Sequence, residues 1–145
     1  MPHLMKSINI LHRAQAMYRT RRSADGFPAA HHTFVFAISA NPGKTQDELA
    51  ELLFLNKSTV ARTLTALEER GLVRREPNPD DKRQLRVYPT EAMVRMRPVV
   101  AAIALDWNSA ITEGISEGEL AVFERVLAVM EKNADSALKR GGAEE

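Results

Sequence analysis

Hydrophobic side chains recur every three or four residues along most of the chain, and short stretches rich in glycine, proline and asparagine interrupt them. This spacing predicts a first helix before the turn at residues 25–28 and a second helix between Pro28 and the turn at residues 41–43. The second segment is apolar on nearly all sides, so we expect it to lie at the centre of the fold. The first segment carries apolar residues on two neighbouring faces, and we expect both faces to be buried.

Capping signals mark the next two helices. Thr45 and Glu48 form a capping box, in which the hydroxyl accepts from the amide of Glu48 and the carboxylate reaches back to the cap amide. Asn56 is a favourable N-cap for the following helix, and Gly71 is a favourable stop. Only residues 54–56 link the two helices, which is typical of a helix-turn-helix.

After Gly71 the period changes to two residues. Val73 and Arg75 alternate with Arg74 and Glu76, and after a proline-rich turn Leu85 and Val87 alternate with Arg86 and Tyr88. A period of two residues around a polar turn is typical of a two-stranded hairpin. The sequence therefore predicts a β wing directly after the helix-turn-helix.

Two long helices are expected in the rest of the chain. Thr90 can cap the first of them, and Pro98 inside it should cause a kink. Ser116 and Glu119 form a second capping box, which should start the last helix.

These elements together predict a mainly α fold in a single domain over residues 1–145. A three-helix lobe with a β-hairpin wing, a winged helix-turn-helix, would occupy residues 28–90. The terminal helices, residues 1–24 and 91–140, carry more apolar surface than a small lobe can cover. We therefore expect them to be dimerisation helices.

The charge is unevenly divided along the chain. Its net value is only +1, but residues 1–86 hold 14 Lys and Arg against 9 Asp and Glu, whereas residues 87–145 hold 6 against 10. The positive charge of the N-terminal part favours contact with a polyanion such as nucleic acid. Chance scatter is the alternative on charge alone.

The second helix of the helix-turn-helix presents a small, polar and basic outward face. Such a face can enter the major groove of DNA, where each base pair shows a distinct pattern of donors and acceptors. Arg62 can form a bidentate pair with guanine, and Ser58 and Thr59 can bond a base or a phosphate. The alternative is the ordinary solvated face of an amphipathic helix. The outward residues are Lys57, Ser58, Thr59, Arg62, Thr63 and Ala66.

Basic residues on the hairpin favour the DNA-binding interpretation, because a hairpin tip with arginine can reach into a narrow minor groove. Asp80 and Asp81 would be repelled by phosphate if they faced it, so we expect one of them to brace Arg83. An unpaired, solvated turn is the alternative. The basic residues are Arg74, Arg75, Lys82, Arg83 and Arg86.

Residues 42–90 resemble the multiple antibiotic resistance regulator (MarR) family, in the stretch PGKTQDELAELLFLNKSTVARTLTALEERGLVRREPNPDDKRQLRVYPTE. The shared features are the two helices and three motifs. The motifs are the STV and arginine of the second (recognition) helix, Leu-Glu-x-x-Gly-Leu-Val at the end of that helix, and Asp-x-Arg in the wing. The resemblance implies that Ser58, Thr59 and Arg62 contact bases and phosphates, and that Asp81 and Arg83 are the Asp-x-Arg pair. The predicted DNA-binding residues are Thr45, Gln46, Lys57, Ser58, Thr59, Arg62, Thr63, Arg74, Asp81, Lys82 and Arg83.

The same resemblance implies a homodimeric transcription regulator that reads a short palindrome in double-stranded DNA, expected here to be a repressor. It also implies release by a small phenolic, aromatic or anionic effector. A pocket between the lobe and the dimer helices could use five side chains, and the alternatives are that they only pack the junction or that the regulator has no ligand. They are His12, Tyr18, His31, Phe34 and Trp107.

Several classes of protein are not indicated. The chain has no cysteine, which excludes thiolate metal sites and thiol redox sensing, and no apolar run approaches the roughly 20 residues of a membrane span. We find no signal peptide and expect a cytoplasmic protein without membrane contact. The histidines lack zinc-ligand spacing and no catalytic motif occurs, so we expect neither an enzyme nor a metal or other cofactor. The alternative of a winged-helix adaptor that binds protein would need an acidic or apolar wing.

Overall fold

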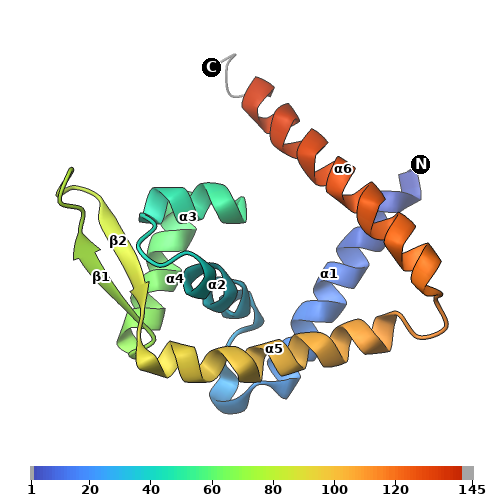
Figure 1. Cartoon of the computed structure of the whole chain (residues 1–145), viewed down its shortest axis with the longest axis horizontal. Helices are drawn as coiled ribbons and strands as arrows, with labels where there is room; N and C mark the ends of the chain where they lie inside the picture. Colours follow the sequence, from blue (N-terminus) through green and yellow to red (C-terminus); the bar gives the residue numbers. More distant parts are fainter. Residues whose placement is uncertain (1, 142–145) are drawn as a thin grey trace. The chain divides into compact units, whose positions relative to one another are not determined.

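The computed structural model describes residues 2–141 and contains the predicted elements in the predicted order (Figure 1). Strands β1 (Val73–Pro77) and β2 (Leu85–Pro89) pair as an antiparallel hairpin. The fold is mainly α with a two-stranded wing, which confirms the predicted class. The helices are α1 (Pro2–Arg22), α2 (Ala29–Ala40), α3 (Gln46–Leu53), α4 (Lys57–Glu69), α5 (Glu91–Ile111) and α6 (Glu117–Gly141), with a short 3-10 turn, η1 (Ala24–Gly26).

The chain divides into two compact units, residues 1–107 and 108–145. The first contains α1 to β2 and most of α5, and the second contains the end of α5 and α6. The boundary falls inside a helix. The predicted organisation as one domain with a lobe at residues 28–90 stays a prediction.

The core of the first unit gathers around α2, which contacts α1, α3 and β2. Phe34, Val35 and Ile38 are at most 2% exposed, which confirms the central place expected for this helix. Pro28 is the extended N-cap of α2, with φ −64° and ψ 138°, so the helix begins one residue later than expected. Other side chains of this core are Leu49, Val60, Leu64, Leu67, Val73, Val87, Met93 and Val100.

The predicted caps hold the helix-turn-helix. Thr45 Oγ1 accepts from the Glu48 amide at 3.2 Å, and Asn56 Oδ1 accepts from the Thr59 amide at 2.8 Å. Only half of the Thr45–Glu48 capping box forms, because the Glu48 carboxylate lies 3.9 Å from Lys44 Nζ and, within residues 2–141, accepts no hydrogen bond from the Thr45 amide. These caps satisfy amides that lack partners inside the helices and so fix where α3 and α4 begin.

The wing is tied to the loop before α3. The Gly43 amide donates to the Val87 carbonyl at 2.8 Å, and the Val87 amide donates to the Lys44 carbonyl at 2.9 Å. Gly43 has φ +85°, and a Cβ at this position would lie 3.3 Å from the Tyr88 ring. The close approach of this loop to β2 therefore depends on glycine.

The expectation that both apolar faces of α1 are buried is wrong for the single chain. α1 packs on α2, but five large apolar side chains of α1 are 43–57% exposed. A single copy of the first unit has no further element to cover them. They are Leu4, Met5, Ile10, Leu11 and Met17.

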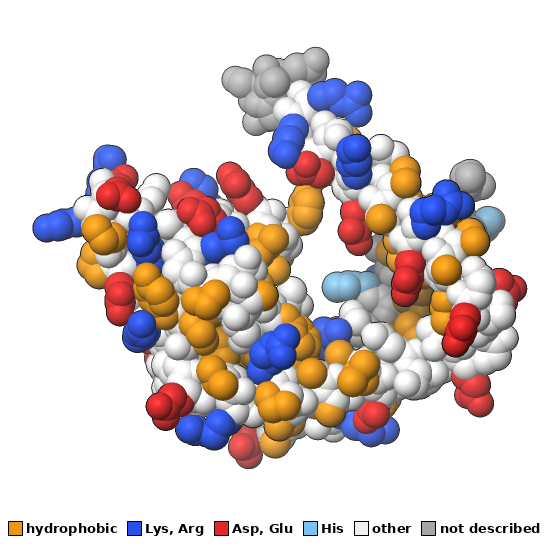
Figure 2. All heavy atoms as spheres, in the orientation of Figure 1, with side chains coloured by type: hydrophobic (Ala, Val, Ile, Leu, Met, Phe, Trp, Pro, Cys, Tyr) orange, Lys and Arg blue, Asp and Glu red, His pale blue; other side chains and the backbone are white. Residues whose placement is uncertain are grey.

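In the second unit, the Ser116–Glu119 capping box is complete. The Ser116 amide donates to Glu119 Oε2 at 3.0 Å, and the Glu119 amide donates to Ser116 Oγ at 3.3 Å. Apolar side chains lie exposed among the charged ones of α6 (Figure 2). They are Val122, Phe123, Val126, Val129 and Leu138. Neither α6 nor any other helix within residues 2–141 has the length and apolarity to cross a membrane.

Candidate nucleic-acid interface

The residues predicted to read bases lie on the outer side of α4. Lys57, Ser58 and Arg62 are exposed, whereas Thr59 and Thr63 are half-buried. Within residues 2–141, Arg62 has no hydrogen bond or ion pair. Its guanidinium therefore keeps all five donors for an outside acceptor such as the edge of a guanine.

The start of α4 is held by polar contacts. Ser58 Oγ donates to Asn56 Oδ1 at 2.9 Å, and Lys57 Nζ lies 3.2 Å from Asp47 Oδ2 on α3. Exposed ion pairs of this kind contribute little stability, so a phosphate could take the place of Asp47. Lys57 can thus serve as a link between the helices or as a phosphate contact.

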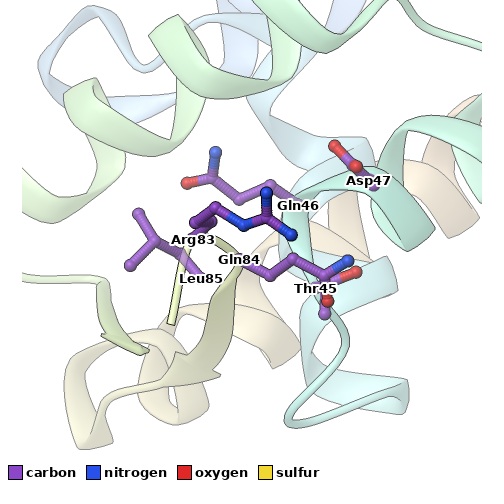
Figure 3. Close-up of a pocket in the computed structure, with 6 residues that line it drawn as sticks. All are labelled: Thr45, Gln46, Asp47, Arg83, Gln84 and Leu85. Carbon is purple, nitrogen blue, oxygen red and sulfur yellow. The ribbon is translucent and has the colours of Figure 1, made fainter. Parts of the chain in front are cut away.

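A small hollow of about 90 Å³ lies between the start of α3 and the wing (Figure 3). The sequence predicted Thr45 as a DNA contact. In the structure Thr45 is only 5% exposed and its hydroxyl caps α3, so it lies below the surface. The positive end of the α3 dipole and the Arg83 guanidinium favour an anion here, and the Asp47 carboxylate opposes one. The lining residues are Thr45, Gln46, Asp47, Arg83, Gln84 and Leu85.

At the wing tip, Asp81 braces Arg83. Arg83 Nε donates to Asp81 Oδ1 at 3.1 Å, and Nη2 donates to Oδ2 at 3.3 Å. The hydrogen bonds from Arg83 hold the pKa of Asp81 below its usual range, so the carboxylate stays ionised. Asp80 instead lies 3.7 Å from Arg86. The geometry shows that Asp81 is the brace that the sequence led us to expect.

The other basic residues of the hairpin do not share one environment. Arg74 lies 4.6 Å from the centre of the Tyr88 ring and 3.2 Å from Glu76, and Lys82 is exposed with no partner in the part of the chain that the structure describes. Arg75 is different, because its guanidinium turns inward to α3 and α4. On the face drawn in Figure 2, acidic and basic side chains intermingle over the winged lobe.

The five side chains predicted to form one effector pocket are not brought together. The rings of Tyr18 and Trp107 lie 5.3 Å apart beside a hollow of about 280 Å³. His12 lines a different hollow between α1 and α2, because residues six apart on a helix point in different directions. Phe34 is 2% exposed and packs in the core, and His31 packs edge-on against Phe27.

The neighbouring His32 is fully buried. Its Nε2 lies 2.8 Å from Ser23 Oγ, and Ser23 in turn donates to the Arg19 carbonyl at 2.7 Å. Burial lowers the pKa of His32, and the charge of Arg19 lowers it further, so the ring is neutral near pH 7. No group of three or more metal-ligating side chains occurs among residues 2–141.

Comparison with known proteins points to the same family as the sequence motifs. The model of the MarR family matches residues 25–84. The uncharacterized HTH-type transcriptional regulator YybA of Bacillus subtilis (strain 168) is 24% identical over 104 residues, which cover 72% of this chain and 69% of YybA. Among solved structures, a MarR transcriptional regulator from Methanosarcina mazei Go1 is 24% identical to this chain in sequence. Its crystal structure matches with a TM-score of 0.88 over 92% of this chain and 97% of that chain.

A second solved structure includes nucleic acid. It is a Listeria monocytogenes protein assigned to the MarR family of transcriptional regulators and complexed with a 26mer DNA. It is 20% identical to this chain, with a TM-score of 0.86 over 92% of this chain and 90% of that chain. The sequence motifs, the fold and the family model, which matches residues 25–84, together support a MarR-family winged helix-turn-helix transcription regulator.

Proposed function

We propose that this chain represses transcription as a homodimer that binds a palindrome in double-stranded DNA, in the cytoplasm and without catalysing a reaction. The observation that carries the proposal is the combination of an exposed Arg62 on α4, without a partner among residues 2–141, and a braced Arg83 at the wing tip. With α4 in the major groove, the wing can reach the flanking minor groove. The DNA complex of the Listeria relative supports this use of the fold.

A gel shift at several salt concentrations, with the DNA upstream of the chain's own gene, tests this proposal. We expect a shift that excess duplex of scrambled sequence does not remove. The logarithm of the binding constant should fall linearly with the logarithm of the salt concentration, because phosphate contacts release counterions. Equal binding to the scrambled duplex would contradict sequence-specific recognition, and the absence of any shift would contradict binding to this operator.

Removal of the Asp81 brace should change the DNA affinity in the direction opposite to that expected from charge alone. Asp81→Ala should weaken DNA binding at all sites, because Arg83 is then no longer oriented by the carboxylate. Simple electrostatics predicts the reverse, since an acid beside DNA is removed. A salt titration of Asp81→Ala beside Asp80→Ala, its neighbour outside the brace, measures the difference. Tighter binding by Asp81→Ala would show that Asp81 is only a solvated turn residue.

Exposed apolar surface on α1 and on α6 supports the homodimer. Phe123 is 53% exposed and Leu138 is 63% exposed. Burial stabilises by about 25 cal/mol per Å² of apolar surface, so covering these faces with a second copy is favourable. The proposal of a dimer accounts for the faces that the single chain leaves open.

We expect the protein to sediment as a dimer at micromolar concentration. Phe123→Asp should shift it toward monomer, because the carboxylate would have to enter an apolar interface. Glu124→Gln, a neighbouring exposed change on α6, should leave the dimer intact. A monomer for the parent protein at moderate salt would contradict the dimer.

The effector part of the proposal rests on the hollow beside Tyr18 and Trp107. Arg21 and Arg22 also line it, and the Arg22 guanidinium lies 4.8 Å from the centre of the Tyr18 ring. Aromatic walls with cations at the edge suit a small aromatic anion. We propose that such a ligand binds here and releases the repressor from DNA.

Trp107 is the only tryptophan, so its fluorescence reports on this hollow. Titration with benzoate, the simplest aromatic anion, should change the fluorescence and weaken the gel shift over the same concentration range. Tyr18→Leu should reduce both effects. If benzoate weakens DNA binding without changing Trp107 fluorescence, the effector site lies elsewhere. If neither changes, this hollow does not bind aromatic anions.

A further inference from the structure

The Arg75 side chain is held inside the winged lobe. It is 17% exposed, because alternate residues of a strand face opposite sides and its neighbours on β1, Arg74 and Glu76, face solvent. Its Nε donates to Glu68 Oε2 at 3.3 Å, and its Nη2 donates to Glu68 Oε1 at 3.0 Å. This two-point pair with α4 fixes the plane of the guanidinium as well as its position.

The same guanidinium reaches two further residues. Nη1 donates to Gln46 Oε1 on α3 at 3.1 Å, and Nη2 lies 3.3 Å from Thr65 Oγ1 on α4. Arg75 thus joins the wing to both helices of the helix-turn-helix. A lysine could not replace it, because a single ammonium has neither the five donors nor the planar fork.

These contacts also decide which atoms of Gln46 face outward. Arginine has only donors, so the carboxamide oxygen of Gln46 must face Arg75. The NH₂ group of the Gln46 carboxamide then points away from Arg75 and is free to donate to another acceptor. Gln46 lines the hollow between α3 and the wing that also contains Arg83 (Figure 3), where a donor suits a phosphate oxygen.

The charge around Arg75 argues against a direct DNA contact. Its guanidinium lies against the Glu68 carboxylate, and the Arg75 hydrogen bonds lower the pKa of Glu68, which therefore stays ionised. A DNA phosphate approaching Arg75 would meet this carboxylate as well. The surface near the pair therefore offers little net positive charge to a polyanion.

We propose that Arg75 is a positioning residue, which fixes the wing relative to α4 and holds the Gln46 amide outward without touching DNA. The proposal rests on the proposed DNA-binding function. It assigns one of the five basic wing residues to specificity and placement, and leaves Arg74, Lys82 and Arg83 as the wing residues expected to contact DNA.

Two matched acid replacements provide the sharpest test. Glu68→Gln and Glu76→Gln each remove one negative charge near the wing, and both should tighten DNA binding if only charge matters. Positioning by Arg75 predicts that Glu68→Gln weakens binding severalfold because the clamp loosens. Glu76→Gln should leave binding unchanged or tighter. Equal tightening by both variants would overturn the proposal.

Salt titration of Arg83→Ala and of the double variant Arg75→Ala/Arg83→Ala separates positioning from contact. If Arg75 acts through the wing, the two variants should show the same slope of log binding constant against log salt. A direct phosphate contact would lower the slope by about one more unit in the double variant. Such a further decrease would contradict the proposal.

Hydrogen exchange of the free protein tests the clamp without DNA. Arg75→Ala should speed exchange of amides in residues 73–89, while amides of α2 keep the parent rates if the core stays folded. Unchanged exchange in the wing would overturn the clamp even if DNA binding falls. If the parent protein binds no duplex but the wing exchange increases as expected, the proposed function fails and the clamp stands.

Discussion

Replacement of Arg62 with alanine is expected to weaken binding to the preferred duplex by about 1–3 kcal/mol for each base that Arg62 reads, and to relax the choice of base at one position in each half-site. The reason is geometric, because Arg62 lies exposed on α4 and no other residue within 2–141 occupies its donors. Binding to duplexes with all four bases at each half-site position measures both effects. A uniform decrease over all duplexes would instead show that Arg62 holds a phosphate.

Arg62→Lys is the matched control. Lysine keeps the positive charge and most of the length but cannot form the bidentate pair with guanine. Affinity for unrelated duplex should therefore stay near that of the parent, while discrimination falls as in Arg62→Ala. If Arg62→Lys keeps full discrimination, charge alone accounts for the role of Arg62.

The largest effect on stability is expected for Phe34→Ala. Phe34 is 2% exposed and packs in the central cluster with Ile38 and Leu64, so its removal forms a cavity and also takes away buried apolar surface. Changes of this kind cost about 3–5 kcal/mol. Chemical denaturation followed by circular dichroism measures the free energy of unfolding.

Phe36→Ala is a suitable comparison, because Phe36 lies on the same helix but is only partly buried. It should cost clearly less than Phe34→Ala. If Phe34→Ala left the stability unchanged and altered only the response to an aromatic anion, Phe34 would be a pocket residue after all. The predicted decrease in stability would instead assign Phe34 to the core alone.

Local signals in the sequence were sufficient for the helix-turn-helix and the wing. Thr45 and Asn56 accept hydrogen bonds from helix amides as the capping patterns predict, and Gly71 adopts φ +69° just after the end of α4. The brace between Asp81 and Arg83 was also predictable, since the two residues are only two positions apart. Features that depend on neighbours along the chain are therefore well predicted.

Contacts between distant segments were not predictable in the same way. The alternation along β1 puts Arg75 on the same face as buried Val73, but only the tertiary fold places Gln46 and Glu68 against it. The five side chains expected to form one effector pocket lie apart for a related reason, because helical spacing predicts the apolar faces of α1 and α2 but not which residues pack in the core. Phe34 packs in the core, whereas Tyr18 lies at a hollow.

We propose that a second copy of the chain supplies the burial expected for α1. The apolar residues that the sequence marks on α1 are present, but one chain leaves five of them exposed. A sequence pattern shows that a face must be covered and does not say by which molecule. The proposed dimer is consistent with both the pattern and the exposure.

Selection of bound duplexes from a random pool tests the central claim most directly. A two-fold dimer with one α4 in each of two successive major grooves should enrich an inverted repeat, with half-site centres about 10 base pairs apart. Arg62→Ala should relax one position in each half of that repeat. Enrichment of single, unpaired half-sites, or of no sequence at all, would contradict the account of this protein as a dimeric reader of palindromic DNA.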